Sequence, residues 1–194
     1  MNIELAKKED SLEIAKIHKE EIKKGFLSTL SVSFLKNMYL SIIDSDINFC
    51  IVAKENGTVI GFISGVSDLD KFYSNFFKKY LLKSFVILFK KFFSISFLVK
   101  VFETLFYPVK EKDLPKAELL TIAVRSEFQG QGIANKMFLE FLSEMKKKNI
   151  KFFKVLVGKE LKPAIGFYEK NGFKFLKNTK VHGNKTSRIY IYNV

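Results

Sequence analysis

Hydrophobic and polar positions change their period along the chain, and each change marks an expected element. Near the N-terminus, Ile3 and Leu5 alternate with polar residues as in a short strand. Apolar residues then recur with helical spacing over 11–24, closed by Gly25, and again over 33–43. We therefore expect the chain to open with one strand followed by two helices.

A β-rich pattern follows. Residues 47–55 and 58–66 are rich in β-branched and aromatic residues, and Asn56-Gly57 between them is a strong signal for a tight hairpin turn. The mixture of strands and helices predicts an α/β fold of the α+β type in a single domain over 1–194. Further strands are expected at 117–124, 152–157, 173–176 and 187–192, and further helices at 131–148 and 163–170.

The stretch from about 68 to 109 departs from this rhythm. It is crowded with phenylalanines and lysines in a pattern that predicts two amphipathic helices, and charges interrupt it too often for a membrane span. We expect a helical insertion between the third and fourth strands. Three interpretations stay open: a hairpin that completes the core, a wall over a substrate pocket, and a surface that docks on a membrane or a second subunit.

Composition narrows the class of partner. The 194 residues carry a formal charge of +13, which favours an anionic partner. Arg125 and Arg188 are the only arginines, so specific nucleic-acid recognition is disfavoured. Cys50 is the only cysteine and lies in an apolar run, which predicts a core residue. The first residues contain acids instead of an apolar secretory segment, and we expect a cytoplasmic protein.

A glycine-containing segment over 129–134 follows an apolar strand and opens an amphipathic helix. Glycines let backbone amides approach a ligand, and the helix N-terminus adds positive potential, so the segment predicts an anion cradle, most naturally for a pyrophosphate. A dinucleotide fingerprint needs a third small residue where Asn135 stands, and a Walker loop needs Gly-Lys-Ser/Thr. A plain strand-to-helix turn is the alternative. The segment reads Gln129, Gly130, Gln131, Gly132, Ile133 and Ala134.

Two segments resemble motifs of the GNAT superfamily of N-acetyltransferases. Gln129, Gly132 and Ala134 match its pyrophosphate loop, Gln/Arg-x-x-Gly-x-Gly/Ala. Ala164 and 167–173 are similar to its Ala-x-x-hydrophobic-Tyr-x-x-x-Gly-Phe motif. The resemblance covers 119–176 by motif and the remainder by order of elements. It implies a central, mostly antiparallel mixed sheet, flanked by helices, with a V-shaped splay between strands 4 and 5.

The resemblance also implies a reaction and its residues. Acetyl-CoA would acetylate a primary amine by direct attack in a ternary complex, with Tyr168 as the acid that protonates the leaving thiolate. The backbone of Ile122, Ala123 and Val124 would bind the pantetheine arm, with the Val124 amide as oxyanion donor. The loop residues from Gln129 to Ala134, together with Tyr168, would complete the cofactor site. No metal is expected, because no Cys/His cluster has metal-ligand spacing.

Glu118 is the candidate base by the same resemblance. Period-two alternation places it on one face with Leu120, Ile122 and Val124, where a carboxylate is unusual unless the face opens to a cleft. Burial would raise its pKa. An exposed carboxylate at a strand end is the alternative. Other branches of the superfamily place the base on the next strand, where this chain has Leu156.

Other positions bear on the acceptor and the cofactor. Leu161 stands where many relatives carry an asparagine that binds the pantetheine, Glu160 is a second candidate base, and His182 could reach the acceptor side. We expect a small-molecule amine, such as an amino sugar or its nucleotide conjugate, with a protein or peptide amine as the alternative. A non-catalytic acyl-CoA-binding module is a further alternative. A homodimer stays open.

Overall fold

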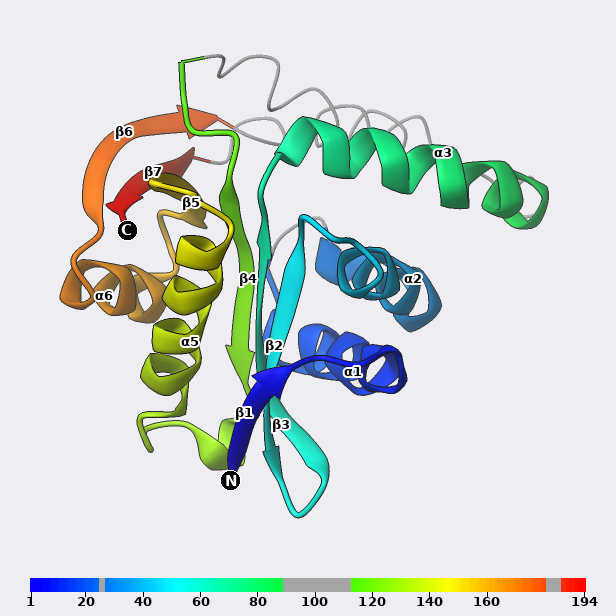
Figure 1. The fold of residues 1–194 in the computed structure, drawn as a ribbon, viewed down its shortest axis with the longest axis horizontal. Helices are drawn as coiled ribbons and strands as arrows, with labels where there is room; N and C mark the ends of the chain where they lie inside the picture. Colours follow the sequence, from blue (N-terminus) through cyan, green and yellow to red (C-terminus); the bar gives the residue numbers. More distant parts are fainter. Residues whose placement is uncertain (25–26, 89–112, 181–185) are drawn as a thin grey trace.

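The computed structural model describes residues 1–24, 27–88, 113–180 and 186–194 (Figure 1). Its strands form one sheet in the order β1-β2-β3-β4-β5-β7-β6. Neighbouring strands are antiparallel except for β4 and β5, which are parallel. The predicted mixed, mostly antiparallel sheet is therefore confirmed. The strands are β1 (Asn2–Leu5), β2 (Phe49–Glu55), β3 (Thr58–Val66), β4 (Glu118–Val124), β5 (Phe152–Gly158), β6 (Lys174–Lys180) and β7 (Thr186–Asn193).

Helices cover both faces of this sheet, as Figure 1 shows. One face packs against the helices nearer the N-terminus, and the other face packs against the two helices that follow β4 and β5. The first group is α1 (Ser11–Glu21), α2 (Val32–Ile43) and α3 (Leu69–Leu88), and the second is α5 (Ile133–Lys147) and α6 (Lys162–Lys170).

Strict alternation along β2 divides its side chains between two cores. Phe49, Ile51 and Ala53 pack on the side of α5, whereas Cys50 and Val52 pack on the side of α1 and α2. Both sets are buried, which explains why the sequence reads as a continuous apolar run. The prediction that Cys50 is a core residue is confirmed.

Local signals in the sequence account for several boundaries. Asn56 and Gly57 both have positive φ, 49° and 81°, as a two-residue hairpin with the twist of its strands requires. The Ser31 hydroxyl accepts a hydrogen bond from the Phe34 amide at 3.2 Å and caps α2. The hairpin and this helix form where the sequence predicts them.

Other boundaries differ from the predicted ones. Helix α1 ends at Glu21, because Ile22 leaves helical geometry with φ −101° and ψ 81°, and Gly25 lies outside the described residues. Strand β6 runs over Lys174–Lys180, longer than the predicted 173–176, because antiparallel pairing with β7 sustains a strand whose side chains are mostly exposed.

The predicted insertion is described in part. Its first helix is α3, while the predicted second helix falls on residues 89–112, outside the described part of the chain. Among the helices that the structure describes, none has the length and apolar character needed to cross a bilayer.

Strands β4 and β5 diverge from a single point of contact. Between them the register contains one pair, Glu118 opposite Lys154, and the Lys154 amide donates to the Ala117 carbonyl at 3.0 Å. Beyond this apex β5 pairs along its whole length with β7 instead. The predicted V-shaped splay between strands 4 and 5 is confirmed.

Candidate active site

The splay leaves backbone groups of β4 without a strand partner. The Arg125 amide donates to Ile60 of β3 at 2.9 Å, and the Ala123 carbonyl oxygen lies against Gly61 of the same strand. Alternation therefore turns the amides and carbonyls of Ile122 and Val124 toward β5, and neither residue pairs with a residue of that strand. An extended ligand could bind these groups as an added strand would, whereas the backbone of Ala123 faces β3.

The glycine loop lies directly after this strand. Gly130 and Gly132 have φ of 77° and 75°, in the left-handed region that favours glycine. A Cβ at either position would meet nothing within 4 Å, so the surface of the loop is open. Gly132 is the N-cap of α5, whose first turn carries no acidic residue. Backbone amides and the positive end of the α5 dipole therefore face an accessible surface that suits a phosphate group.

The remaining loop residues anchor this surface. Ile133 is buried in the core and Ala134 packs against it, while Gln131 is exposed. The Gln129 side-chain amide donates to the Val124 carbonyl at 2.8 Å. This hydrogen bond joins the loop to the end of β4 on its open side. It therefore fixes the position of the anion cradle relative to the unpaired edge of the strand.

Helix α1 holds the same loop from the other side. The Arg125 guanidinium lies 3.1 Å from Glu13 and 3.0 Å from Glu20, and the carboxylate of Glu21 accepts from the amide and hydroxyl of Ser126 at 3.0 and 2.7 Å. Arg125, one of two arginines in a lysine-rich chain, thus serves as a planar fork between two carboxylates.

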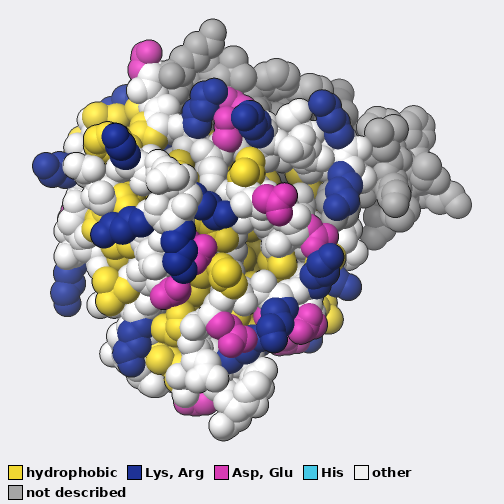
Figure 2. Space-filling view, viewed as in Figure 1, with side chains coloured by type: hydrophobic (Ala, Val, Ile, Leu, Met, Phe, Trp, Pro, Cys, Tyr) yellow, Lys and Arg dark blue, Asp and Glu magenta, His cyan; other side chains and the backbone are white. Residues whose placement is uncertain are grey.

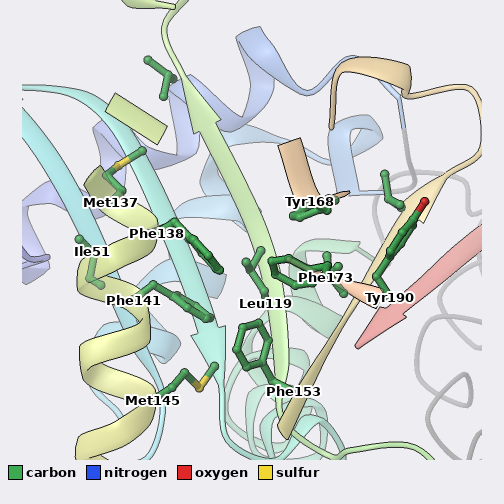
Figure 3. Packing of buried hydrophobic residues seen from close by; sticks show 14 of the residues in the cluster. Ile51, Leu119, Met137, Phe138, Phe141, Met145, Phe153, Tyr168, Phe173 and Tyr190 are labelled. Carbon is green, nitrogen blue, oxygen red and sulfur yellow. The ribbon is translucent and has the colours of Figure 1, made fainter. Parts of the chain in front are cut away.

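Tyr168 lies on the α5–α6 side of the splay. It is 5% exposed, and its ring packs on Phe173 at a centroid distance of 5.1 Å (Figure 3). Its ring also contacts that of Phe167, at 5.5 Å. Burial raises the pKa of the phenol above its usual value, and the negative charge of Glu118 raises it further. The hydroxyl therefore keeps its proton at neutral pH.

Glu118 lies at the apex and is 7% exposed. Burial raises the pKa of its carboxyl, and the ammonium of Lys154, 3.5 Å from Oε2, acts in the opposite direction. Among the described residues this Oε2 has no hydrogen-bond partner. Glu118 is therefore buried, as the first interpretation of the sequence predicted, and is not an exposed carboxylate at a strand end.

The prediction that Glu118 shares one face of the strand with Leu120, Ile122 and Val124 was partly wrong. Ser64 of β3 pairs with Thr121 but Gly65 pairs with Leu119, so a bulge at Leu120 breaks the alternation. Leu119, Ile122 and Val124 all pack with the α5 core, whereas Leu120 and Ala123 pack with the α1–α2 core. Because Ala117 and Leu119 flank Glu118 and point to α5, the Glu118 side chain points to the opposite face, with Leu120 and away from Ile122.

The candidate acid and base consequently approach the splay from opposite faces of the sheet. Tyr168 belongs to the α5–α6 core and Glu118 points toward α1–α3, and the charge of the Glu118 carboxylate contributes to the raised pKa of the Tyr168 phenol. A group bound in the splay can therefore meet a carboxylate on one side and a neutral phenol on the other. Such a pair suits removal of one proton and delivery of another.

Sequence reasoning missed two residues near Glu118. Lys154 is a buried lysine within an apolar strand, and that position was the available signal. Tyr73 of α3 has a pKa raised by burial and then by the charge of Glu118, so the insertion reaches this part of the molecule.

The other sequence candidates lie elsewhere. Leu161 immediately precedes α6 and packs against the core, Leu156 is partly buried on β5, and Glu160 is exposed. His182 lies outside the described residues. In the described part of the chain, no three His, Cys, Asp or Glu side chains group together as metal ligands.

A separate cavity of about 360 Å³ contains neither Glu118 nor Tyr168. Two of its charges face each other, since the Arg188 guanidinium lies 3.9 Å from Glu169 and also lies over the Phe175 ring at 5.7 Å. Figure 2 shows lysine and arginine side chains spread among acidic and apolar ones over the face in view, so positive charge is not gathered there into one patch. Residues of α6, β6 and β7, with one loop lysine, line the cavity: Lys159, Glu169, Phe175, Asn178 and Arg188.

Comparisons with known proteins point in one direction. A model of the acetyltransferase (GNAT) family matches residues 19–173. No curated protein matches by sequence. Solved structures share the fold across nearly all of the chain. Their sequence identities are low, so these matches show the fold alone.

Several of these structures are of N-acetyltransferases, and three of them illustrate the match. One is from Staphylococcus aureus Mu50, at 16% identity, TM-score 0.64, 99% of this chain and 100% of that one. The PaiA N-acetyltransferase of Thermoplasma acidophilum, solved with coenzyme A, has 21% identity and TM-score 0.59 over 99% and 100%. The ribosomal-protein-S18-alanine N-acetyltransferase of Escherichia coli has 15% identity and TM-score 0.61 over 99% and 92%.

Proposed function

This chain belongs to the GNAT family of acetyltransferases, and on that premise we propose that it transfers the acetyl group of acetyl-CoA to a primary amine of a small molecule. Family membership makes it an acyl-CoA-dependent N-acetyltransferase. The acceptor and the roles of individual residues are the proposal. The observation that carries it is the splay, which opens beyond the single pair of Glu118 and Lys154 and borders the glycine loop through the hydrogen bond from Gln129 to the Val124 carbonyl.

The residues around the splay fit coenzyme A. The open amides at Gly130 and Gly132 and the N-terminus of α5 would bind its pyrophosphate. Its pantetheine arm would add to β4 through the backbone groups of Ile122 and Val124. Gln129 would hold both parts in register through its bond to the Val124 carbonyl. The acetyl thioester would then lie inside the splay.

The reaction needs a neutral amine, a stabilised oxyanion and a protonated thiolate. Glu118 takes a proton from the acceptor ammonium, directly or through water, and the amine then attacks the thioester carbon. The Val124 amide donates to the oxygen that becomes negative. When the C–S bond breaks, the proton of Tyr168 passes to the departing sulfur, and the surplus proton of the nitrogen restores the phenol through solvent.

The depth of Glu118 supports a slender acceptor. Glu118 is 7% exposed, and among the described residues α3 covers the sheet on the face to which its carboxylate points, so we infer that an acceptor reaches it from between β4 and β5. An unhindered primary amine fits this access, which supports a small molecule over a folded protein surface. An amino sugar or its nucleotide conjugate is one member of this class.

A thiol-release screen tests the proposal. Acetyl-CoA is incubated with amino sugars, polyamines, amino acids and N-terminal peptides, and free coenzyme A is followed with a thiol reagent. We expect turnover with at least one small primary amine, and loss of it in Glu118→Gln. Turnover with peptides alone would show that the acceptor is a peptide or protein amine instead of a small molecule. Tight binding of acetyl-CoA without turnover on any amine would indicate a non-catalytic binding module.

A further inference from the structure

Lys154 makes an unusual set of contacts for a lysine inside a strand. Its side chain is 3% exposed, between the buried Phe153 and Val155. Its ammonium donates to the Pro115 carbonyl at 2.5 Å and lies 3.5 Å from Glu118 Oε2, and its own amide donates to the Ala117 carbonyl at 3.0 Å. Glu118 is the first residue of β4, and Pro115 and Ala117 lie in the segment that leads into it, so one residue of β5 contacts the other arm of the splay through both its backbone and its side chain.

Burial of an ammonium is unfavourable unless it is paired, and the pairing here is specific. Lys154 belongs to the single register pair that joins β4 to β5, and its partner in that pair is Glu118. An apolar residue would suit the packing here, because Leu156, two residues further on and on the same face of the strand, packs against the apolar α1–α3 core. The packing of the sheet therefore does not account for a charged residue at this position.

We propose that Lys154 is a positioning residue of the active site, which keeps the buried Glu118 carboxylate ionised and fixes it at the apex of the splay. The proposal rests on the proposed role of Glu118 as the base. In a site without this ammonium, burial would favour the protonated carboxyl, which cannot accept a proton from the acceptor.

Other charged or titratable groups near Glu118 do not replace Lys154. The phenols of Tyr73 on α3 and Tyr168 on α6 interact with Glu118, but their pKa values are raised and both stay neutral. Lys116, on the same segment as Glu118, is exposed and lies 3.9 Å from Asp68. On α1, His18 is neutral and hydrogen-bonded to Tyr39 of α2. Among the described residues, Lys154 is thus the cation that acts on Glu118.

The pH profile of kcat/KM tests the proposal in the full chain. Lys154→Met keeps the length of the side chain and removes its charge, and Lys154→Arg keeps the charge. In Lys154→Met we expect the acid limb to move up by about one to three pH units, the effect of one nearby opposite charge, with KM for acetyl-CoA unchanged. In Lys154→Arg the limb should stay close to that of the wild type. An unmoved limb in Lys154→Met would overturn the proposal.

The variant Glu118→Gln distinguishes failure of this proposal from failure of the proposed role of Glu118 as the base. If Glu118 is the base, this variant loses the acid limb. Retention of the limb would overturn the base role itself, whereas a lost limb together with an unmoved Lys154→Met profile would overturn only the role of Lys154.

Stability measured against pH covers the case in which Lys154→Met is too unstable to assay. Without the ammonium, ionised Glu118 is left unpaired, so the destabilisation of Lys154→Met relative to wild type should grow as pH rises above the usual pKa of a glutamate. Urea unfolding from acid to neutral pH measures it. A difference that is the same at every pH would show packing alone and would overturn the proposal.

Discussion

His18 gives a prediction whose size follows from the structure. It lies on α1 with 1% exposure, its Nδ1 is 2.6 Å from the Tyr39 hydroxyl, and its ring stacks on Phe62 at 6.5 Å. Its Nε2 has no partner among the described residues. Burial, with a smaller contribution from the charge of the nearby Lys19, lowers the pKa of His18 from 6.5 to about 4. The folded protein therefore holds this ring neutral where the unfolded chain would protonate it.

The sign and magnitude follow from linkage. Because the folded pKa is below the unfolded one, stability is fully present above pH 6.5 and falls as pH drops toward 4. The shift of about 2.5 pH units, at about 1.4 kcal/mol each, gives a total of about 3.5 kcal/mol, of which about 2 kcal/mol is lost at pH 5. That loss is a large fraction of the stability of an ordinary domain.

Urea unfolding followed by circular dichroism at pH 8 and pH 5 measures this loss. His18→Gln removes the titrating ring but keeps a neutral polar side chain within reach of Tyr39. Since all other groups titrate in both proteins, the wild type should lose about 2 kcal/mol more than His18→Gln between the two pH values. Equal losses in wild type and His18→Gln would refute the reasoning.

Three further predictions concern the site. Tyr168→Phe should lower kcat about a hundredfold, as loss of a general acid does, with the Kd of acetyl-CoA unchanged by calorimetry; unchanged turnover would remove Tyr168 from the acid role. Glu118→Gln should lower kcat/KM at neutral pH by a similar factor and lose the acid limb set by Glu118, with relief only at high pH where the free amine is abundant; an undiminished kcat/KM at neutral pH would place the base elsewhere. Gly132→Ala, at φ 75°, should cost about 1 kcal/mol and raise KM for acetyl-CoA, whereas Gly166→Ala within α6 should do neither; equal effects of the two glycine variants on KM would argue against a cofactor role for the loop.

Much of the fold was predictable because its signals are local. The Asn56-Gly57 turn, the helical spacing of α2 and the glycines before α5 each depend on residues close in sequence, and each element formed within a few residues of its predicted place. The splay was different. No period in the sequence reveals that β5 leaves β4 after one pair, and only the family resemblance predicted it.

The site was less predictable because its geometry depends on distant partners. The face of Glu118 was inferred from alternation, but the bulge that breaks this alternation arises from register with Ser64 and Gly65, which lie more than fifty residues earlier. Lys154 was visible as a lysine in an apolar strand, yet the sequence does not say that its ammonium meets Glu118. Likewise, His18 carried no signal in the sequence, and its buried bond to Tyr39 joins two helices.

The central claim is direct transfer of acetyl from acetyl-CoA to an amine held in the same complex. The most direct measurement combines initial rates over a grid of acetyl-CoA and amine concentrations with mass spectrometry of the amine. We predict intersecting double-reciprocal lines and one acetylated amine formed for each coenzyme A released. Parallel lines, or thiol release without acetylated amine, would contradict it.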